Sequence, residues 1–329
     1  MVDSASSTFS VRPLDNNVSG RLALVTGARL FFPTACNYDS GGIGSACVRA
    51  LAHEGCHVAL HYNSNSVSIH LVFVFPFYRA IGCANFSLNQ PTNQNEEFTK
   101  RLASELREGH PGQTFTTHRA DMSNREESQG LINAVLEAHK KHQKSIAILV
   151  LNAGLGRRIR DITDISLQDW DDVIQVNSTS PFILLKSCLD QSGGRMRNAQ
   201  WGRVILIGSI SSKGGGINGC HYAASKGALC SMGMNLARVL APDNNTVNCI
   251  SPALIRDTGM VPAAQALPQD LSSKLQGSLM SQSDLGTKLA SSIPLGRLGH
   301  PTEVANLVIM LAKTGYMTGQ DIVVGGGLL

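Results

Sequence analysis

The sequence predicts an α/β protein with a doubly wound, mostly parallel sheet of about seven strands and helices on both faces. Three observations predict it. Short runs of apolar and β-branched residues recur along most of the 329 residues. Between them lie longer stretches in which apolar residues recur with the period of a helix. A glycine-rich turn joins the first such run to the first helical stretch, as is typical of parallel βαβ units.

The expected strands are short runs rich in Val, Ile, Leu and Ala, each bounded by polar residues or glycine. The run at 145–151 (SIAILVL) is apolar almost throughout, as expected for a strand that helices cover on both faces. In chain order we expect strands at 21–26, 57–62, 114–119, 145–151, 203–207, 246–250 and 321–324.

The expected helices lie between these strands and are long enough to cover the sheet. Their apolar residues recur every three or four positions, which gives each helix one face to bury. In chain order we expect helices at 43–54, 96–107, 125–142, 170–189, 222–240 and 302–312.

We expect one domain over residues 20–329, preceded by a polar tail at 1–19, because no repeat and no long linker divides the chain. Two insertions, near 30–40 and 66–92, interrupt the alternation of strands and helices. Such connections usually have about 2–6 residues, so both insertions are anomalous.

Composition narrows the class of protein. Hydrophobic residues make up 43% and charged residues 16%, as in globular proteins. The net charge of +4 comes without a Lys/Arg run, so we expect no nucleic-acid or membrane partner. The eight cysteines show no metal-binding spacing, so we expect no metal, and we expect cysteines such as Cys220 and Cys230 to be reduced packing residues. The sequence shows no secretory signal and no membrane-spanning run, so we expect a cytoplasmic location.

The glycine-rich turn is split by the first insertion. Thr26-Gly27-Ala28-Arg29 follows the first expected strand, and Gly41-Gly42-Ile43-Gly44 precedes the first expected helix. If the insertion is looped out, Gly27, Gly42 and Gly44 take the three glycine positions of a dinucleotide-binding turn. There the backbone approaches the pyrophosphate and the helix N-terminus supplies N–H donors. A flexible turn that binds no ligand is the alternative interpretation.

Tyr222-Ala-Ala-Ser-Lys226 places a phenol and an ammonium group one turn apart on the same face of an expected helix. A phenol with a pKa of about 10 is a poor acid or base at neutral pH. We expect the nearby cation to lower that pKa and make the phenol usable. A solvated helix face is the alternative interpretation. His221 precedes the tyrosine but points to another side of the helix, so we expect it to be non-catalytic.

Taken in order, these residues resemble the short-chain dehydrogenase/reductase family over residues 20–329 apart from the two insertions. The resemblance implies a Rossmann-like domain and a nicotinamide cofactor. The stretch at 293–299 and the C-terminal segment are most similar to the 3-oxoacyl-carrier-protein reductases. The residues that match the family's cofactor site are Thr26, Gly27, Gly42, Ile43, Gly44, Asp121, Met122, Asn152, Ala153, Gly154, Pro252 and Thr258.

The resemblance also implies four catalytic residues. Tyr222 would donate a proton to a carbonyl oxygen as hydride arrives, or remove one from an alcohol in the reverse direction. Lys226 would lower the pKa of the phenol and hydrogen-bond the nicotinamide ribose. Ser209 would orient the substrate oxygen. Asn177 would hold a water that relays protons from Lys226 to solvent.

Three of the assigned residues, two catalytic and one in the cofactor site, have alternative interpretations. Ser211 and Ser212 lie beside Ser209, and a shift of register could make either one the orienting hydroxyl. Ser209 lies thirteen positions before Tyr222, a spacing that favours Ser209. Asn177 could instead bridge neighbouring backbone groups, and Asn152 could be structural.

The choice between the two nicotinamide cofactors depends on the end of the second expected strand. A carboxylate there usually binds the ribose 2′-hydroxyl of NAD, whereas this strand ends in Tyr62-Asn63-Ser64. Arg29 in the glycine turn could pair with the 2′-phosphate of NADP. We therefore expect NADP(H), with NAD(H) the less favoured cofactor.

The insertion near 30–40 lies inside the turn that must contact the pyrophosphate. A displaced turn would lose backbone donors, so a cofactor-impaired, non-catalytic protein is one alternative function. We hypothesise that both insertions are translated non-coding sequence or another gene-model error, and that the natural enzyme lacks them. Removing them restores an uninterrupted glycine turn.

The favoured function is NADP(H)-dependent reduction of a ketone, a 3-oxoacyl or other small carbonyl compound, to a secondary alcohol. An NAD-dependent alcohol, polyol or steroid dehydrogenase is the alternative on the same scaffold. The segment at 260–290 does not identify the ligand. The C-terminal stretch at 319–327 resembles the family's usual ending, which helps to form its oligomers and so implies a homodimer or homotetramer.

Overall fold

The computed structural model describes residues 14–28, 42–63, 93–141, 145–190, 195–214, 218–258 and 290–328. The two insertions lie outside these residues. The described strands form one seven-stranded sheet in the order β3-β2-β1-β4-β5-β6-β7, and every neighbouring pair is parallel. The strands are β1 Leu22–Val25, β2 His57–Tyr62, β3 Phe115–Arg119, β4 Ile148–Leu151, β5 Gly202–Ile207, β6 Asn245–Pro252 and β7 Asp321–Val324. All seven expected strands are confirmed.

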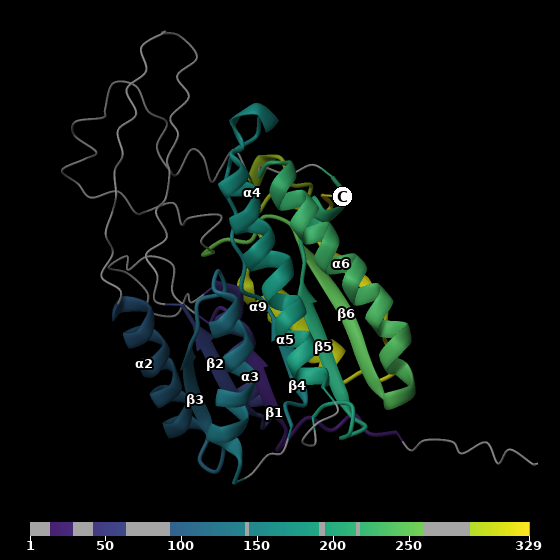
Figure 1. Cartoon of the computed structure of the whole chain (residues 1–329). Helices are drawn as coiled ribbons and strands as arrows, with labels where there is room; N and C mark the ends of the chain where they lie inside the picture. Colours follow the sequence, from purple (N-terminus) through teal and green to yellow (C-terminus); the bar gives the residue numbers. More distant parts are fainter. Residues whose placement is uncertain are drawn as a thin grey trace, which may run out of the picture.

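Helices cover both faces of the sheet, as predicted. In Figure 1, α3, α5 and α6 lie in front of the strands, and α9 lies behind them. Among the described helices, none is long and apolar enough to cross a membrane. The main helices are α1 Gly42–His53, α2 Asn93–Gly109, α3 Arg125–His139, α4 Leu167–Ile174, α5 Ser180–Leu189, α6 Cys220–Leu240 and α9 Pro301–Ala312.

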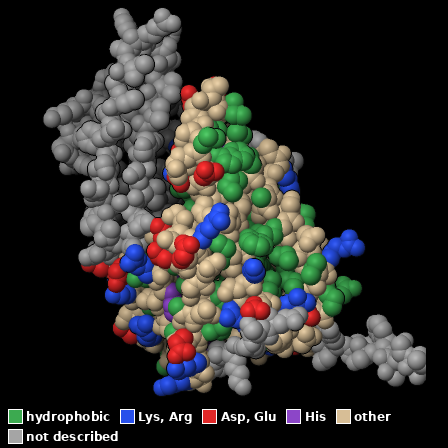
Figure 2. Space-filling view, viewed as in Figure 1, with side chains coloured by type: hydrophobic (Ala, Val, Ile, Leu, Met, Phe, Trp, Pro, Cys, Tyr) green, Lys and Arg blue, Asp and Glu red, His purple; other side chains and the backbone are tan. Residues whose placement is uncertain are grey.

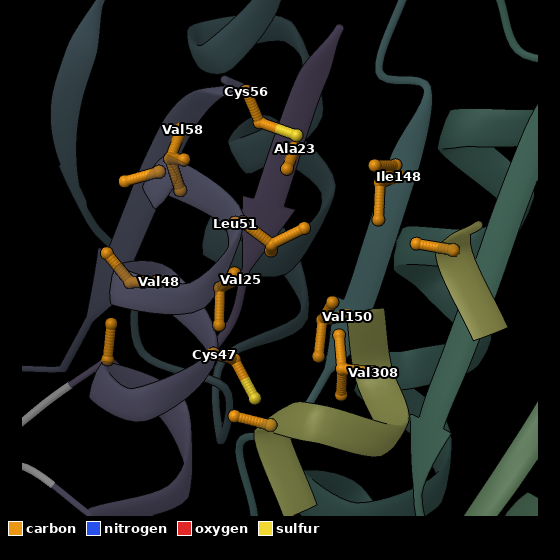
Figure 3. Close-up of a cluster of buried hydrophobic side chains, with 14 of the residues drawn as sticks. Ala23, Val25, Cys47, Val48, Leu51, Cys56, Val58, Ile148, Val150 and Val308 are labelled. Atoms are coloured by element: carbon orange, nitrogen blue, oxygen red, sulfur yellow. The ribbon is translucent and has the colours of Figure 1, made fainter. Parts of the chain in front are cut away.

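The core has two layers because successive side chains of a strand point to opposite faces. Ala23 and Val25 of β1 pack with α1, α2 and α9. Leu22 and Leu24 of the same strand pack with α3, α5 and α6. Figure 3 shows part of the first layer, where Val25 lies among side chains from α1, the strands and α9. Burial on both faces explains why the inner strands β1, β4 and β5 are apolar runs and do not alternate, whereas the edge strand β3 is partly exposed and more polar.

The helix expected at 170–189 is the one element whose form differs clearly. It begins earlier, at Leu167, where Ser166 and Asp169 form a reciprocal capping box. It then passes through a π-helical turn, Gln175–Thr179, before α5. Apolar periodicity cannot reveal such a turn, because one inserted residue leaves the buried face nearly unchanged. The π turn contains Asn177.

The strand order reverses at β1, which lies between β2 and β4. In open parallel sheets, ligands bind in the crevice at the carboxyl ends of the strands beside such a reversal. The residues singled out from the sequence come just after the carboxyl ends of the strands. Thr26 and Gly27 follow β1, Asn63 follows β2, Asp121 follows β3, Asn152 follows β4, and Ser209 follows β5. The fold therefore gathers them at one edge of the sheet.

Candidate active site

The two halves of the split glycine turn are in contact. Gly27 has a φ of 73°, in the region that favours glycine. A Cβ on Gly44 would lie 2.3 Å from the Gly27 carbonyl oxygen and 2.8 Å from Nδ2 of Asn152, so only glycine fits there. The two described ends of the turn, at residue 28 and residue 42, are therefore brought together in the structure.

Thr26 and Asn152 hold this turn against the end of β4. The Thr26 Oγ1 accepts hydrogen bonds from the backbone N–H groups of Asn152 at 2.9 Å and Ala153 at 3.0 Å. The Asn152 amide donates to the carbonyl oxygens of Thr26 at 3.0 Å and Gly27 at 3.2 Å. These bonds give Asn152 the structural role that the sequence left open.

His61, at the end of β2, is a site residue that the sequence analysis missed. Its Nδ1 accepts a hydrogen bond from the Gly27 N–H at 3.1 Å, and its Nε2 lies 2.9 Å from the Ala120 carbonyl oxygen. The ring is neutral in this arrangement, with its proton on Nε2. His61 thus links the glycine turn to the ends of β2 and β3. Strand register is the signal that could have found it, since Val25 pairs with Leu60.

Ser209, Tyr222 and Lys226 meet in a buried cluster at the end of β5, with exposed fractions of 8%, 4% and 3%. Burial raises the pKa of Tyr222 to about 12, and a hydrogen bond between Ser209 and the phenol acts in the opposite direction. This bond favours Ser209 over Ser211 and Ser212 as the orienting hydroxyl.

The expected lowering of the Tyr222 pKa by Lys226 is wrong for this structure. The Lys226 Nζ lies 6.0 Å from the centre of the phenol ring and donates a 2.8 Å hydrogen bond to the Ile207 carbonyl oxygen. Burial also lowers the pKa of Lys226 to about 8, against an opposing influence of Cys249 and Cys230. Desolvation therefore sets the direction of both pKa shifts.

Asn177 and Lys226 approach each other across Gly154. A Cβ on Gly154 would lie 3.4 Å from both the Asn177 Oδ1 and the Lys226 Nζ. The Asn177 Oδ1 accepts from the Leu155 N–H at 2.7 Å, and its Nδ2 donates to the Leu155 carbonyl oxygen at 2.8 Å and the Ser225 hydroxyl at 2.9 Å. Asn177 is thus a backbone bridge, and its role in a water relay stays a prediction.

The carboxylate of Asp121 lies beside the end of β2. Its Oδ1 accepts hydrogen bonds from the Asn63 amide at 3.0 Å and from both the N–H and the hydroxyl of Ser123. Tyr62 is buried, which raises its pKa. Two residues expected at the cofactor, Arg29 and Ser64, lie outside the described residues.

The remaining predicted residues flank the crevice or support it. Gly42 begins α1, and a Cβ there would lie 3.5 Å from the Asp257 carbonyl oxygen, which brings the segment after β6 beside the glycine turn. That segment includes Thr258, whose hydroxyl donates to the Ile255 carbonyl oxygen. Pro252 ends β6. Two others are support residues: Ile43 packs against the core, and Met122 is buried.

A dinucleotide fits these residues. The close packing of Gly27, Gly44 and Asn152 keeps the turn free of side chains at these positions, and the N-terminus of α1 starts in the crevice. In the first turn of α1, the buried Ser45 hydroxyl has no hydrogen-bond partner among the described residues. The N–H groups in the first turn of a helix have no partner within the helix, and together with the Ser45 hydroxyl they suit a diphosphate.

Fold and site together define a dinucleotide-binding oxidoreductase of the doubly wound α/β class. Comparison with known proteins agrees with this class of protein. Residues 90–329 match the family model described as enoyl-(acyl carrier protein) reductase. The chain belongs to the short-chain dehydrogenase/reductase family, and it is an NAD(P)-dependent enzyme of that family.

Among curated proteins, the chain is similar to 3-oxoacyl-[acyl-carrier-protein] reductases. It is 32% identical to that of Aquifex aeolicus over 203 residues, which cover 61% of this chain and 73% of the relative. It is 28% identical to that of Rickettsia bellii over 315 residues, which cover 95% of this chain and 98% of the relative.

Among solved structures, the fold matches a blue fluorescent protein from a metagenomic library in complex with NADPH. The TM-score is 0.66 at 26% identity, covering 94% of this chain and 98% of that one. An NAD+-bound xylitol dehydrogenase has the same fold, with a TM-score of 0.66 at 23% identity and coverage of 94% and 99%.

Proposed function

We propose that this enzyme reduces a ketone to a secondary alcohol with NADPH, and that its substrates are 3-oxoacyl thioesters or similar small carbonyl compounds. The observation that carries the proposal is the buried cluster of Ser209, Tyr222 and Lys226 at the same sheet edge as the closed glycine turn. The curated relatives, named as 3-oxoacyl-carrier-protein reductases, support the substrate class.

Tyr222 is the proton donor in this proposal. Its pKa of about 12 keeps the phenol protonated at neutral pH, which is the form that reduction requires. The phenol transfers its proton to the carbonyl oxygen of the substrate, and Ser209 donates a hydrogen bond to the same oxygen. The bound nicotinamide supplies the hydride.

Lys226 makes the proton transfer reversible. Once the phenol has lost its proton, a buried phenolate is costly unless a cation lies nearby. The ammonium group of Lys226 lies 6.0 Å from the centre of the phenol ring, and it would offset part of this cost once the phenolate forms. The adjacent Asn177 would hold a water through the second lone pair of its Oδ1 and return protons from solvent.

NADP(H) is favoured over NAD(H) because β2 ends at Tyr62 and is followed by Asn63, so that no carboxylate stands at the end of this strand. The NADPH bound to the blue fluorescent protein supports this choice. Asp121 argues for NAD(H), since its carboxylate lies beside Asn63 and could accept from a ribose hydroxyl. Dissociation constants for NADPH and NADH, measured on the full-length chain, separate the two cofactors.

A homodimer or homotetramer is also part of the proposal. Large apolar side chains are exposed on adjacent helices: Trp170 on α4, Phe182 on α5, and Met234 and Val239 on α6. Figure 2 shows hydrophobic side chains gathered on the side of the molecule that carries α5 and α6. An exposed apolar face of this kind marks a protein interface.

The proposed reaction is tested by assaying 3-oxoacyl thioesters and simple ketones with NADPH, and the matching alcohols with NAD+. We expect oxidation of NADPH by the thioesters. Faster oxidation of polyols or steroids with NAD+ would favour the alternative dehydrogenase. If the chain were a non-catalytic protein, NADPH would neither react nor raise its unfolding temperature.

A further inference from the structure

Two cysteines lie in contact behind the catalytic cluster. Cys230 is on α6, one turn after Lys226, and Cys249 is in the middle of β6. Their sulfur atoms are 2.8 Å apart, and both side chains are buried. The contact joins the helix that carries the catalytic tyrosine and lysine to the neighbouring strand.

The cysteine pair borders the backbone that positions Ser209. A Cβ on Gly208 would lie 2.6 Å from the Cys249 sulfur and 3.3 Å from the Cys230 sulfur. Both sulfurs are also close enough to Lys226 to affect its charge, because each raises the pKa that burial lowers. A chemical change at the pair would therefore act on two catalytic groups at once.

Asp321 completes a cluster of three metal-ligand types, since its carboxylate and the two sulfurs lie within 4.8 Å of one another. The geometry nevertheless disfavours a shared metal. Two thiolates on one tetrahedral zinc lie about 3.8 Å apart, so these sulfurs would have to separate by about 1 Å within a packed core. The Asp321 oxygens also have other partners, the Ser251 hydroxyl and the Lys213 ammonium. A disulfide instead needs the sulfurs to move closer.

We propose that Cys230 and Cys249 are an oxidation site, at which a small peroxide converts the two thiols into a reversible disulfide. The Cys230 thiolate attacks one oxygen of the peroxide, the O–O bond breaks, and sulfenic acid and hydroxide form. The Cys249 thiolate then attacks the Cys230 sulfur, the S–S bond forms, and the hydroxyl leaves as water after taking up a proton. The two sulfurs lose two electrons and the peroxide gains them.

Cys230 is the sulfur that reacts first. The hydrogen bond from the Cys249 thiol lowers the pKa of Cys230, whereas the same bond and burial raise that of Cys249. The buried position favours an oxidant as small as hydrogen peroxide over a bulky disulfide. Reduction by a thiol restores the pair.

Oxidation would also slow the enzyme, a consequence that rests on the proposed function. The disulfide removes the negative charge that opposes the loss of the Lys226 proton, and it draws α6 towards β6 beneath Gly208. We expect turnover to fall at least severalfold on oxidation and to return with dithiothreitol.

The test treats the purified full-length chain with hydrogen peroxide, blocks the remaining thiols and maps the peptides by mass spectrometry. We expect the peptides of Cys230 and Cys249 to be joined, with a mass about 2 Da below that of the two thiols. Dithiothreitol should separate them. Cys188→Ser is the matched control, because Cys188 on α5 is a buried thiol that is not part of the pair. The link between Cys230 and Cys249 should persist in this variant. It should be absent from Cys249→Ser, whose folding is checked by circular dichroism.

Cys220 is exposed, so the packing role expected for it is wrong, and it serves as the internal control, since its oxidation shows that the peroxide was active. Oxidised Cys220 without a link between Cys230 and Cys249 would overturn the proposal. So would one equivalent of tightly bound zinc in the wild-type chain that Cys249→Ser loses. The mapping needs no enzymatic turnover, so the oxidation site is judged apart from the proposed reaction. Unchanged turnover of the linked chain would overturn the proposed effect on Lys226.

Discussion

The Lys226 ammonium donates its 2.8 Å hydrogen bond to the carbonyl oxygen of Ile207, the last residue of β5. The lysine is thus anchored to the sheet, with the phenol ring of Tyr222 6.0 Å away. A buried ammonium group held by one carbonyl is costly, which explains why the pKa of Lys226 falls to about 8.

The first prediction concerns stability and pH. Between about pH 8 and 10.5 the unfolded chain keeps the Lys226 proton that the folded chain has lost. The contribution of Lys226 to the free energy of unfolding should therefore rise with pH across this window, by on the order of a few kcal/mol, while the buried thiols Cys47, Cys56 and Cys188, whose pKa values burial raises, oppose it above about pH 9. Tyr222 acts in the opposite direction only above about pH 10, where the unfolded phenol ionises.

Urea unfolding at pH 7.5 and pH 9.5 measures this effect. The Lys226→Met variant removes the titrating group and keeps much of the volume. We expect the wild-type chain to gain stability relative to this variant as the pH rises. If the free energies of unfolding of the two proteins changed with pH in parallel, the lowered pKa could not be assigned to Lys226.

A second prediction concerns the glycine turn. The added methyl group of Gly44→Ala would collide with the Gly27 carbonyl oxygen, so we expect NADPH to bind at least about tenfold more weakly. Gly130→Ala on α3 is the matched control, because no atom lies within 4 Å of the added Cβ. It should leave the affinity unchanged and stabilise the helix by about 0.5–1 kcal/mol. Equal NADPH affinities in both variants would show that the turn does not contact the cofactor.

A third prediction separates the neighbouring serines. Ser209→Ala removes the hydroxyl that bonds the phenol of Tyr222, and we expect turnover to fall by about 100-fold. Ser211→Ala should retain most of the activity, since Ser211 contacts Ser209 through its backbone N–H. Steady-state kinetics with NADPH and one active ketone decide the matter. The reverse order of activities would move the orienting role to Ser211.

A fourth prediction concerns assembly. Phe182 is half exposed on α5, within the apolar face of α4, α5 and α6. Placing a charge there through Phe182→Glu should dissociate the oligomer, while Leu14→Glu, at an exposed position near the N-terminus, should not. Light scattering during gel filtration gives the mass of each. A wild-type chain that is monomeric would refute the interface.

The sequence was sufficient for the fold because five of the strands, β1, β2, β4, β5 and β6, are buried on both faces. Runs such as the one ending at Leu151 can then be recognised without knowing their partners. The π turn around Asn177 was not predictable, because it changes hydrogen bonding within a helix and leaves the apolar pattern intact.

The site was predictable where local motifs carry it and not where contacts depend on distant strands. Tyr222 and Lys226 are one turn apart in the sequence, whereas His61 reaches Gly27 only through the pairing of β1 and β2. The pKa of Tyr222 was expected to fall and instead rises to about 12. The direction of this pKa shift depends on burial by residues far away in the sequence, and a local motif does not contain those residues. The contact between Cys230 and Cys249 has the same origin.

The most direct test of the proposed mechanism is the turnover of Tyr222→Phe. The change removes only the phenol oxygen from a buried ring, so NADPH affinity and unfolding temperature should stay close to those of the wild-type chain. With the proton donor gone, we predict that ketone reduction falls by at least about 100-fold. Wild-type turnover in a folded, NADPH-binding Tyr222→Phe preparation would contradict the assignment of this tyrosine as the proton donor.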